Sequence, residues 1–270
     1  MTNTTRAKNR SQYLKLTTLG VVLCASSWMV AERNAYAQES RKMNQGQSNT
    51  TTSAISETLT ARQQAIIPIA ALAAAGDIGS LNSALNQGLD GGLTISDAKE
   101  ILVQLYAYAG FPRSLNALAE LMKVVEARKQ RGVQDSTGGE PSAPIPKGDE
   151  LLAAGTANQT KLSGAPVKGP LFDFAPAIDE YLKSHLFGDI FERNNLDWQS
   201  RELATVGMLS SITGAESQLQ AHMRISMNVG LTEKQLRQVT EVLAERVGAD
   251  NSRRAREALD RHIATATGTK

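Results

Sequence analysis

Two stretches of the sequence begin with Gly-Leu-Thr and continue with the same pattern: "GLTISDAKEILVQLYAYAG" at residues 92–110 and "GLTEKQLRQVTEVLAERVG" at residues 230–248. In each stretch the threonine is a candidate helix N-cap, and Asp97 or Gln235 three residues later completes a capping box. The apolar positions that follow also agree, because they recur at the spacing of one helix face: Ala98, Ile101 and Leu105 in the first stretch, and Leu236, Val239 and Leu243 in the second. The two stretches therefore predict an internal repeat built from helices.

An alanine-rich apolar segment precedes each copy, at residues 61–77 and 200–216. Each segment is long enough for a buried helix, and an amphipathic helix fits between it and the Gly-Leu-Thr turn. Each copy ends on a glycine, Gly110 or Gly248, at which we expect a left-handed C-terminal cap. No stretch shows the sustained alternation of apolar and polar residues that is typical of β-strands. We therefore predict an all-α fold with two repeated helical units in one chain.

These features divide the chain into five segments. We expect a signal peptide at 1–37, a flexible tether at 38–56, a first helical unit at 57–130, a linker at 131–175 and a second helical unit at 176–266. The tether is polar and aperiodic. The first part of the linker, "RGVQDSTGGEPSAPIPKGDE", is rich in Gly, Pro and Ser and predicts a loop. The aromatic-rich residues that follow it are expected to be helical from about Pro176 and to cover the second unit.

The N-terminal residues have the anatomy of a secretory signal peptide. Four basic residues and no acidic residue precede an apolar run of 15 residues, and the small-x-small pattern Ala35-Tyr-Ala37 follows it. The run is shorter than the roughly 20 residues of a membrane span. An uncleaved anchor is the alternative, and lipid attachment at Cys24 is disfavoured because Leu23 stands where a small residue is expected. We therefore expect a periplasmic or secreted protein with no membrane attachment after cleavage.

Cleavage after Ala37 would remove the only cysteine of the chain and reverse its net charge. The chain has 29 basic and 27 acidic residues, and five of the basic and one of the acidic residues precede Gln38, so 24 basic and 26 acidic residues remain and the net charge is −2. This balance gives no indication of nucleic-acid binding. Without cysteine, the mature chain has no disulfide, no thiolate nucleophile and no cysteine-based metal site, and no other metal-ligand spacing is present.

The second unit carries a series of short motifs in residues 187–209, "FGDIFERNNLDWQSRELATVGML", and residues 217–236, "SQLQAHMRISMNVGLTEKQL": Phe-Gly, Leu-Asp, Arg-Glu-Leu, a histidine, and then Gly-Leu-Thr. In these motifs and their order it resembles the carboxymuconolactone decarboxylase family. Residues 92–118 resemble the end of the same domain, with its Tyr-x-Gly-x-Pro signature at Tyr108, Gly110 and Pro112. The resemblance implies an all-α protein that forms homo-oligomers, often trimers or hexamers.

The resemblance also implies one of two chemistries. Some family members decarboxylate a γ-lactone, whereas the alkylhydroperoxidase D-like members reduce peroxides with a Cys-x-x-Cys-x-x-x-His motif and an upstream glutamate as a proton relay. In this sequence Ala215 and Gln218 stand at the two cysteine positions, so thiol peroxidase chemistry has no nucleophile. The glutamate and the histidine are retained as Glu202 and His222. These two are the predicted catalytic residues, because a histidine can act as an acid or a base near neutral pH.

The two units have diverged in complementary ways. The second keeps Glu202 and His222 but lacks tyrosine and proline at the end of its last matched helix. The first keeps the Tyr-x-Gly-x-Pro end but has no histidine, and Gln63 or Ala65 lies where the glutamate would be. One interpretation is a single composite site with contributions from both units. The other is that each unit decayed separately after a duplication.

Four further residues are predicted to bind substrate. Tyr106 and Tyr108 of the first unit would complete a composite site, although at most one of them can line it because residues two apart in a helix do not share a face. Arg113 or Arg201 could hold a substrate carboxylate through paired hydrogen bonds. The structural alternatives are a surface ion pair for each arginine, a packed and hydrogen-bonded histidine, and a glutamate placed to favour a helix N-terminus.

The sequence thus favours a cofactor-free enzyme of the lyase or isomerase type that acts on a small carboxylated or lactone substrate. Two alternatives stay open. One is the antioxidant, peroxiredoxin-like assignment that this family attracts, here without thiol chemistry. The other is a non-enzymatic periplasmic helical oligomer or ligand-binding protein built on a former enzyme scaffold.

Overall fold

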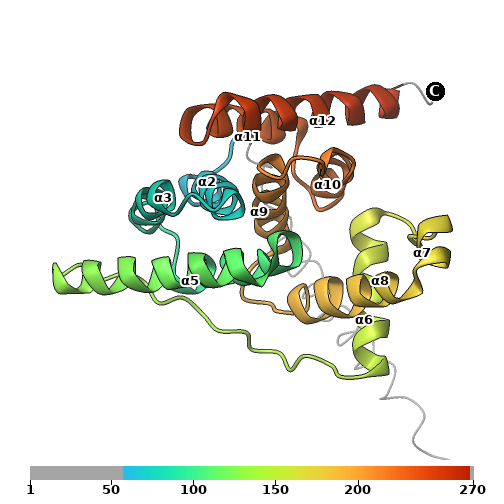
Figure 1. Ribbon diagram of the computed structural model, residues 1–270, viewed down its shortest axis with the longest axis horizontal. Helices are drawn as coiled ribbons and strands as arrows, with labels where there is room; N and C mark the ends of the chain where they lie inside the picture. The colour runs from blue at the N-terminus through green and yellow to red at the C-terminus, as the bar shows by residue number, and fades with distance from the viewer. Residues whose placement is uncertain (1–56, 268–270) are drawn as a thin grey trace, which may run out of the picture. The chain divides into compact units, whose positions relative to one another are not determined.

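The computed structural model describes residues 57–267, and every regular element within that range is a helix (Figure 1). The all-α prediction is confirmed, while the expected signal peptide and tether lie outside the described residues. The first unit contains α2 (Ala61–Ala75), α3 (Ile78–Asp90), α4 (Ile95–Gln104) and α5 (Tyr106–Gln130). The second contains α9 (Trp198–Ser210), α10 (Glu216–Asn228), α11 (Glu233–Arg246) and α12 (Ala249–Thr267). No helix in the described part of the chain combines the length and the apolarity needed to cross a membrane.

The two units repeat one helix order with nearly constant spacing. Both predicted capping boxes are present, at the start of α4 and of α11, where each threonine side chain accepts a hydrogen bond from the backbone N–H three residues on. A second bond recurs: the Ser114 hydroxyl donates to the carbonyl of Leu102, and the Ser252 hydroxyl donates to the carbonyl of Thr240, each over 2.7 Å. Because the paired residues are 138 positions apart, the sequence repeat is also a structural repeat.

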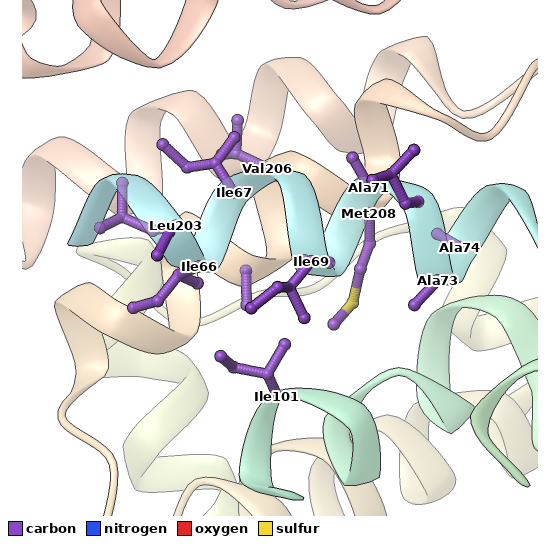
Figure 2. Close-up of a cluster of buried hydrophobic side chains, with 14 of the residues drawn as sticks. Ile66, Ile67, Ile69, Ala71, Ala73, Ala74, Ile101, Leu203, Val206 and Met208 are labelled. Carbon is purple, nitrogen blue, oxygen red and sulfur yellow. The ribbon is translucent and has the colours of Figure 1, made fainter. Parts of the chain in front are cut away.

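One apolar core joins the two units, and α2 lies at its centre. All residues from Ala65 to Ala74 are buried, which agrees with the alanine-rich sequence of this helix. α2 crosses α9 closely at Gly207, where an added Cβ would lie 2.7 Å from the carbonyl oxygen of Ile67. Figure 2 shows the isoleucines of α2 packed with side chains of α9, among them Leu203, Val206 and Met208. Helices of the first and second units are therefore held in direct contact.

The segment expected as a linker contains a helix that sequence analysis missed. Residues 131–148 are largely loop, as predicted, but α6 (Asp149–Ser163) and the short α7 (Pro170–Phe174) follow. α6 packs against the π-helix η1 (Leu182–Ile190), which continues from α8 (Pro176–Tyr181). Gly155 permits this contact, because an added Cβ would overlap the carbonyl of Lys183.

A second, smaller apolar cluster surrounds η1. It combines Phe187 and Phe191 with residues of α6 and α10, and the rings of Tyr106 and Tyr108 pack against it. Two side chains of α10 donate to carbonyls at the end of α6: Arg224 to Ser163 and Asn228 to Leu162. The α6–η1 pair therefore covers the helices that carry the predicted site residues.

The predicted left-handed caps at Gly110 and Gly248 are wrong. α4 already ends at Gln104, and Gly110 has φ 81° and ψ 162°, which produces a kink inside α5 instead of a helix cap. Gly248 is not among the described glycines that have positive φ. The kink at Gly110 separates the first turn of α5, which carries both tyrosines, from the long remainder of the helix.

Candidate functional site

The strongest candidate for chemistry is a buried carboxylate–imidazole pair between α9 and α10. The Oε2 atom of Glu202 lies 2.7 Å from Nδ1 of His222. Glu202 is completely buried, and His222 is 8 % exposed. The predicted partner is therefore in place, whereas Glu216 is exposed and accepts a hydrogen bond from the backbone N–H of Gly214. Glu202 and His222 are twenty positions apart in the chain and meet because α9 and α10 pack as neighbours.

The hydrogen bond gives the two imidazole nitrogens different roles. With Glu202 ionised, Nδ1 carries the proton and donates it to the carboxylate, and Nε2 is left with its lone pair. Nε2 has no hydrogen bond to another residue in the described part of the chain. Glu202 also has an unused acceptor, because its Oε1 atom is buried without a hydrogen-bond partner among these residues. A buried carboxylate oxygen without a protein partner is costly for stability.

Tyr108 of the first unit lies against this pair from the second unit. Its ring meets the His222 imidazole edge-on, with 5.9 Å between the ring centroids. Burial raises the pKa of the Tyr108 phenol well above its usual value of 10.0, and the nearby Glu202 carboxylate raises the pKa further. Tyr108 is therefore a neutral hydroxyl at physiological pH. Its oxygen is 3.2 Å from Oγ1 of Thr205 on α9.

The hydroxyl of Thr205 takes part in three hydrogen bonds. Its hydroxyl has one proton, which it donates to the Arg201 carbonyl at 3.0 Å, one helical turn earlier. Its lone pairs can then accept from Nε2 of Gln104 at 2.8 Å and from the hydroxyl of Tyr108. Gln104 lies on α4 of the first unit. The orientation of Tyr108 is thus determined by a contact between the two units.

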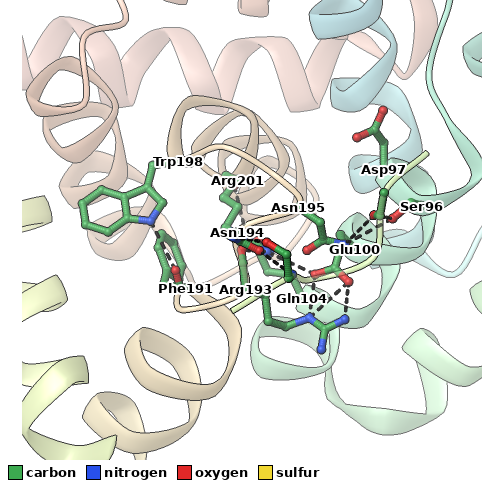
Figure 3. Close-up of polar contacts among 12 residues, drawn as sticks. Ser96, Asp97, Glu100, Gln104, Phe191, Arg193, Asn194, Asn195, Trp198 and Arg201 are labelled. Carbon is green, nitrogen blue, oxygen red and sulfur yellow. Dashed lines mark hydrogen bonds and ion pairs between the residues drawn. The ribbon is translucent and has the colours of Figure 1, made fainter. Parts of the chain in front are cut away.

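Behind this contact lies a buried ionic network (Figure 3). Glu100 of α4 accepts a hydrogen bond from Nη2 of Arg201 at 3.1 Å. The guanidinium of Arg193 donates three more bonds to the same carboxylate, two to Oε1 and one to Oε2. Burial tends to raise the pKa of Glu100, but the bonds from Arg193 and the charge of Arg201 outweigh it and lower the pKa below 4.5. The Glu100 carboxylate is therefore ionised at neutral pH and ties α4 to α9.

The structure separates the predicted substrate-binding residues. Tyr108 joins the Glu202–His222 pair, but Tyr106 stacks on Phe111 with 4.7 Å between the ring centroids. Arg201 is fully buried in the ionic network, so its expected ion pair exists, but in the interior instead of at the surface. Arg113 is exposed and donates to the carbonyl of Ala74 near the end of α2. Arg201 is thus enclosed by protein groups, whereas the exposed guanidinium of Arg113 makes one hydrogen bond, from Nη1.

Thr205, Gln104 and Glu100 were missed in the sequence. Gln104 and Thr205 each stand between two apolar residues in a helix, whereas Glu100 follows Lys99, and all three are buried. Because a buried polar side chain needs a hydrogen-bond partner, a polar residue among apolar helix residues indicates an internal hydrogen-bond network. Their partners lie about 100 positions away in the chain, and local spacing carries no information about such contacts.

The first unit has no equivalent of the pair. Counted by the repeat spacing of 138 residues, Ala84 of α3 corresponds to His222 of α10. The starts of α2 and α9 are 137 residues apart, which places Ala65 opposite Glu202. Both alanines are buried. Proton-transfer groups are therefore found in one of the two units only. No group of three or more His, Cys, Asp or Glu side chains within residues 57–267 is placed to hold a metal ion.

Comparison with known proteins agrees with this division. The family model described as "Carboxymuconolactone decarboxylase family" matches the chain twice, at residues 45–122 and at residues 176–261. The two matches fall on the two helical units, and together they cover more than half of the 270 residues. A search of curated proteins finds no match.

Proposed function

The chain belongs to the carboxymuconolactone decarboxylase family, and from this membership we propose that it is a cofactor-free enzyme of the lyase or isomerase type. The observation that carries the proposal is the buried hydrogen bond of 2.7 Å between Glu202 and His222, beside the Tyr108 ring. In the proposed reaction this pair moves a proton on a small lactone or carboxylated substrate.

The proposed chemistry begins at Nε2 of His222, the ring nitrogen that makes no bond to another described residue. As a general base it takes a proton from the carbon next to the substrate carbonyl, and it can return a proton to the product. The carboxylate of Glu202 accepts from Nδ1–H throughout and stabilises the imidazolium that forms. A buried carboxylate suits this role, because the attraction between opposite charges is stronger where water is excluded.

The surroundings favour a lactone carbonyl over a free carboxylate as the recognised group. Arg201, next to Glu202 in the chain, is fully buried and held in the ionic network. The nearby apolar cluster around η1 is bordered by Tyr106 and Tyr108. An uncharged lactone ring loses less hydration free energy than a carboxylate anion when it enters an apolar environment.

The sequence argues against the thiol peroxidase chemistry of the wider family. Cys24 is the only cysteine, and none occurs within residues 57–267. Ala215 and Gln218 occupy the positions of the redox pair at the start of α10. The peroxidase mechanism needs a thiolate as nucleophile, and neither side chain can supply one.

We place the enzyme outside the cytoplasm and expect it to be a homo-oligomer, as a trimer or a hexamer. The first expectation rests on the signal-peptide pattern of residues 1–37. The second is supported by an apolar stripe on α5, where Phe111, Leu115 and Met122 are 63 %, 60 % and 69 % exposed. Large exposed apolar patches of this kind mark interaction surfaces.

Proton transfer can be tested without knowing the true substrate. The protein is incubated in D₂O with a panel of γ-lactones and hydroxy acids, and deuterium incorporation next to the carbonyl is followed by proton NMR. We expect catalysed exchange with at least one compound, and we expect His222→Ala and Glu202→Gln to reduce its rate by about 10²-fold or more.

The matched control is His185→Ala, because His185 is exposed on η1 and its hydrogen bond is to Asp189. This variant should exchange at the wild-type rate. If the wild type exchanges no compound, or if His222→Ala exchanges as fast as the wild type, the enzyme proposal fails. A non-enzymatic binding protein would then be the better interpretation.

A further inference from the structure

A cavity lies beside Ala84, the residue of the first unit that corresponds to His222 of the second. The cavity has a volume of about 420 Å³, within the range of small-molecule sites. Its walls come from α2 and α3 of the first unit and from the end of α11 of the second. Its lining includes Pro68, Ser80, Ser83, Ala84, Gln87 and Arg246.

Three residues of the cavity wall correspond by the repeat spacing to residues at the Glu202–His222 site. Ala84 in this wall matches His222, and Arg246 matches Tyr108, each 138 positions apart. Pro68 matches Thr205, the partner of the tyrosine, by the 137-residue spacing of α2 and α9. Tyr108, Thr205 and His222, which meet where the two units touch, thus have three counterparts that line one cavity.

The substitutions change the chemistry that the place can support. Alanine at position 84 removes the imidazole, and alanine at position 65 removes the buried carboxylate, so no general base is left. The replacement of tyrosine by Arg246 instead adds a guanidinium, which can hold a carboxylate through paired hydrogen bonds. No ion pair joins Arg246 to another residue in the described part of the chain, and its side chain is exposed.

The opposite wall supplies further polar groups. Ser80, Ser83 and Gln87 are spaced along one face of α3, which turns them toward the same cavity. Glu245, next to Arg246, adds a carboxylate at the rim. A ligand that satisfies this set has one carboxylate for the arginine and at least one hydroxyl or ammonium donor for the glutamate, serine and glutamine oxygens.

We propose that this cavity is a second, non-catalytic site that binds a small carboxylate with a hydroxyl or ammonium group. The duplication then has two outcomes: one unit keeps a site for proton transfer, and the other keeps the cavity and uses it for binding alone. The proposal does not depend on the reaction assigned to His222, because none of the cavity residues takes part in that reaction.

The test is isothermal titration of the purified protein with L-serine and with L-lactate. It is carried out in a His222→Ala background, so that the first site contributes no turnover. Acetate, which lacks the donor group, and ethanolamine, which lacks the carboxylate, are the comparison ligands. We expect one of the two probes to bind once per chain and more tightly than either comparison ligand.

Three variants locate the binding. Arg246→Gln removes the charge and Ser83→Leu fills the cavity from an exposed position of α3, and each should weaken binding about tenfold or more. Arg131→Gln removes a similarly exposed arginine at the end of α5 and should leave the affinity unchanged. Absence of binding by both probes, or equal affinity in Arg246→Gln and the starting protein, overturns the proposal.

Discussion

At the scale of single residues, the site depends on how few hydrogen bonds Glu202 makes. One carboxylate oxygen bonds to His222, and the other is buried with no partner in the described part of the chain. The fold bears this cost, which is usually about 1–3 kcal/mol for a buried unsatisfied group. The bond from Glu202 to His222 is the local feature that favours a functional role for this glutamate.

Replacing each of the two tyrosines by phenylalanine should affect the free energy of unfolding differently. Tyr108→Phe removes the hydroxyl that bonds to Thr205, so we expect the free energy of unfolding to fall by about 1 kcal/mol. Tyr106→Phe should change it by less than about 0.5 kcal/mol, because the Tyr106 ring stacks on Phe111 and phenylalanine preserves that contact. Urea denaturation of both variants measures the difference. An equal loss in both would contradict the placement of Tyr108 in the network.

At the scale of helices, the repeat rests on local rules that each element obeys separately. The capping boxes of α4 and α11 form with distances of about 3 Å from threonine to the residue three positions on. Such bonds join near neighbours in the chain, which is why sequence spacing could predict them. The kink at Gly110 and the helix α6 could not be anticipated in this way, since each depends on packing against residues distant in the chain.

Two glycine-to-alanine substitutions, one at the crossing of α2 and α9 and one away from it, should change the free energy of unfolding in opposite directions. Gly207→Ala should lower the free energy of unfolding by about 1–3 kcal/mol, because the new methyl group would meet the backbone of Ile67. Gly79→Ala in α3 should be neutral or raise it by up to about 1 kcal/mol, since the nearest atom would be 3.8 Å away and alanine favours a helix.

Thermal and urea denaturation of the two variants provide the measurement. The comparison is matched because both substitutions add one methyl group inside a helix. If Gly207→Ala were as stable as the wild type, the close contact between the two units at this point would be disproved.

At the scale of the whole molecule, the two units are held together by charge as well as by the shared core. Glu100 of the first unit bonds to Arg201 and Arg193 of the second. Arg201 is completely buried, and its guanidinium also lies 5.9 Å from the centroid of the Phe191 ring. Burial lowers the pKa of the Arg201 guanidinium below its usual value, and the Glu100 carboxylate opposes that shift. The two charges therefore depend on each other.

This network predicts a stability that falls in acid. The folded pKa of Glu100 is lowered from 4.5, so its contribution is complete above that value and is lost as the pH falls through the lower folded pKa. Glu100→Gln should cost about 3 kcal/mol at pH 7, because a buried arginine loses its counter-charge. The same variant should lose less additional stability than the wild type between pH 5 and about pH 3.

Urea denaturation at several pH values between 7 and 3 tests both parts. Glu241→Gln is the control, because Glu241 is exposed on α11. A pH dependence in Glu100→Gln as steep as in the wild type would show that this carboxylate does not link the units.

The sequence by itself determined the all-α class, the two repeated units, the capped helices and the candidate pair of Glu202 and His222. These follow from helical periodicity, from capping over three residues and from motif order, all of which are properties of short stretches. Only the tertiary structure decided that Tyr108 and not Tyr106 meets the pair, and that Arg201 belongs to an ionic network instead of a substrate site. Those outcomes depend on contacts between residues about 100 positions apart, and such contacts exist only once α4, α5 and α9 have packed together.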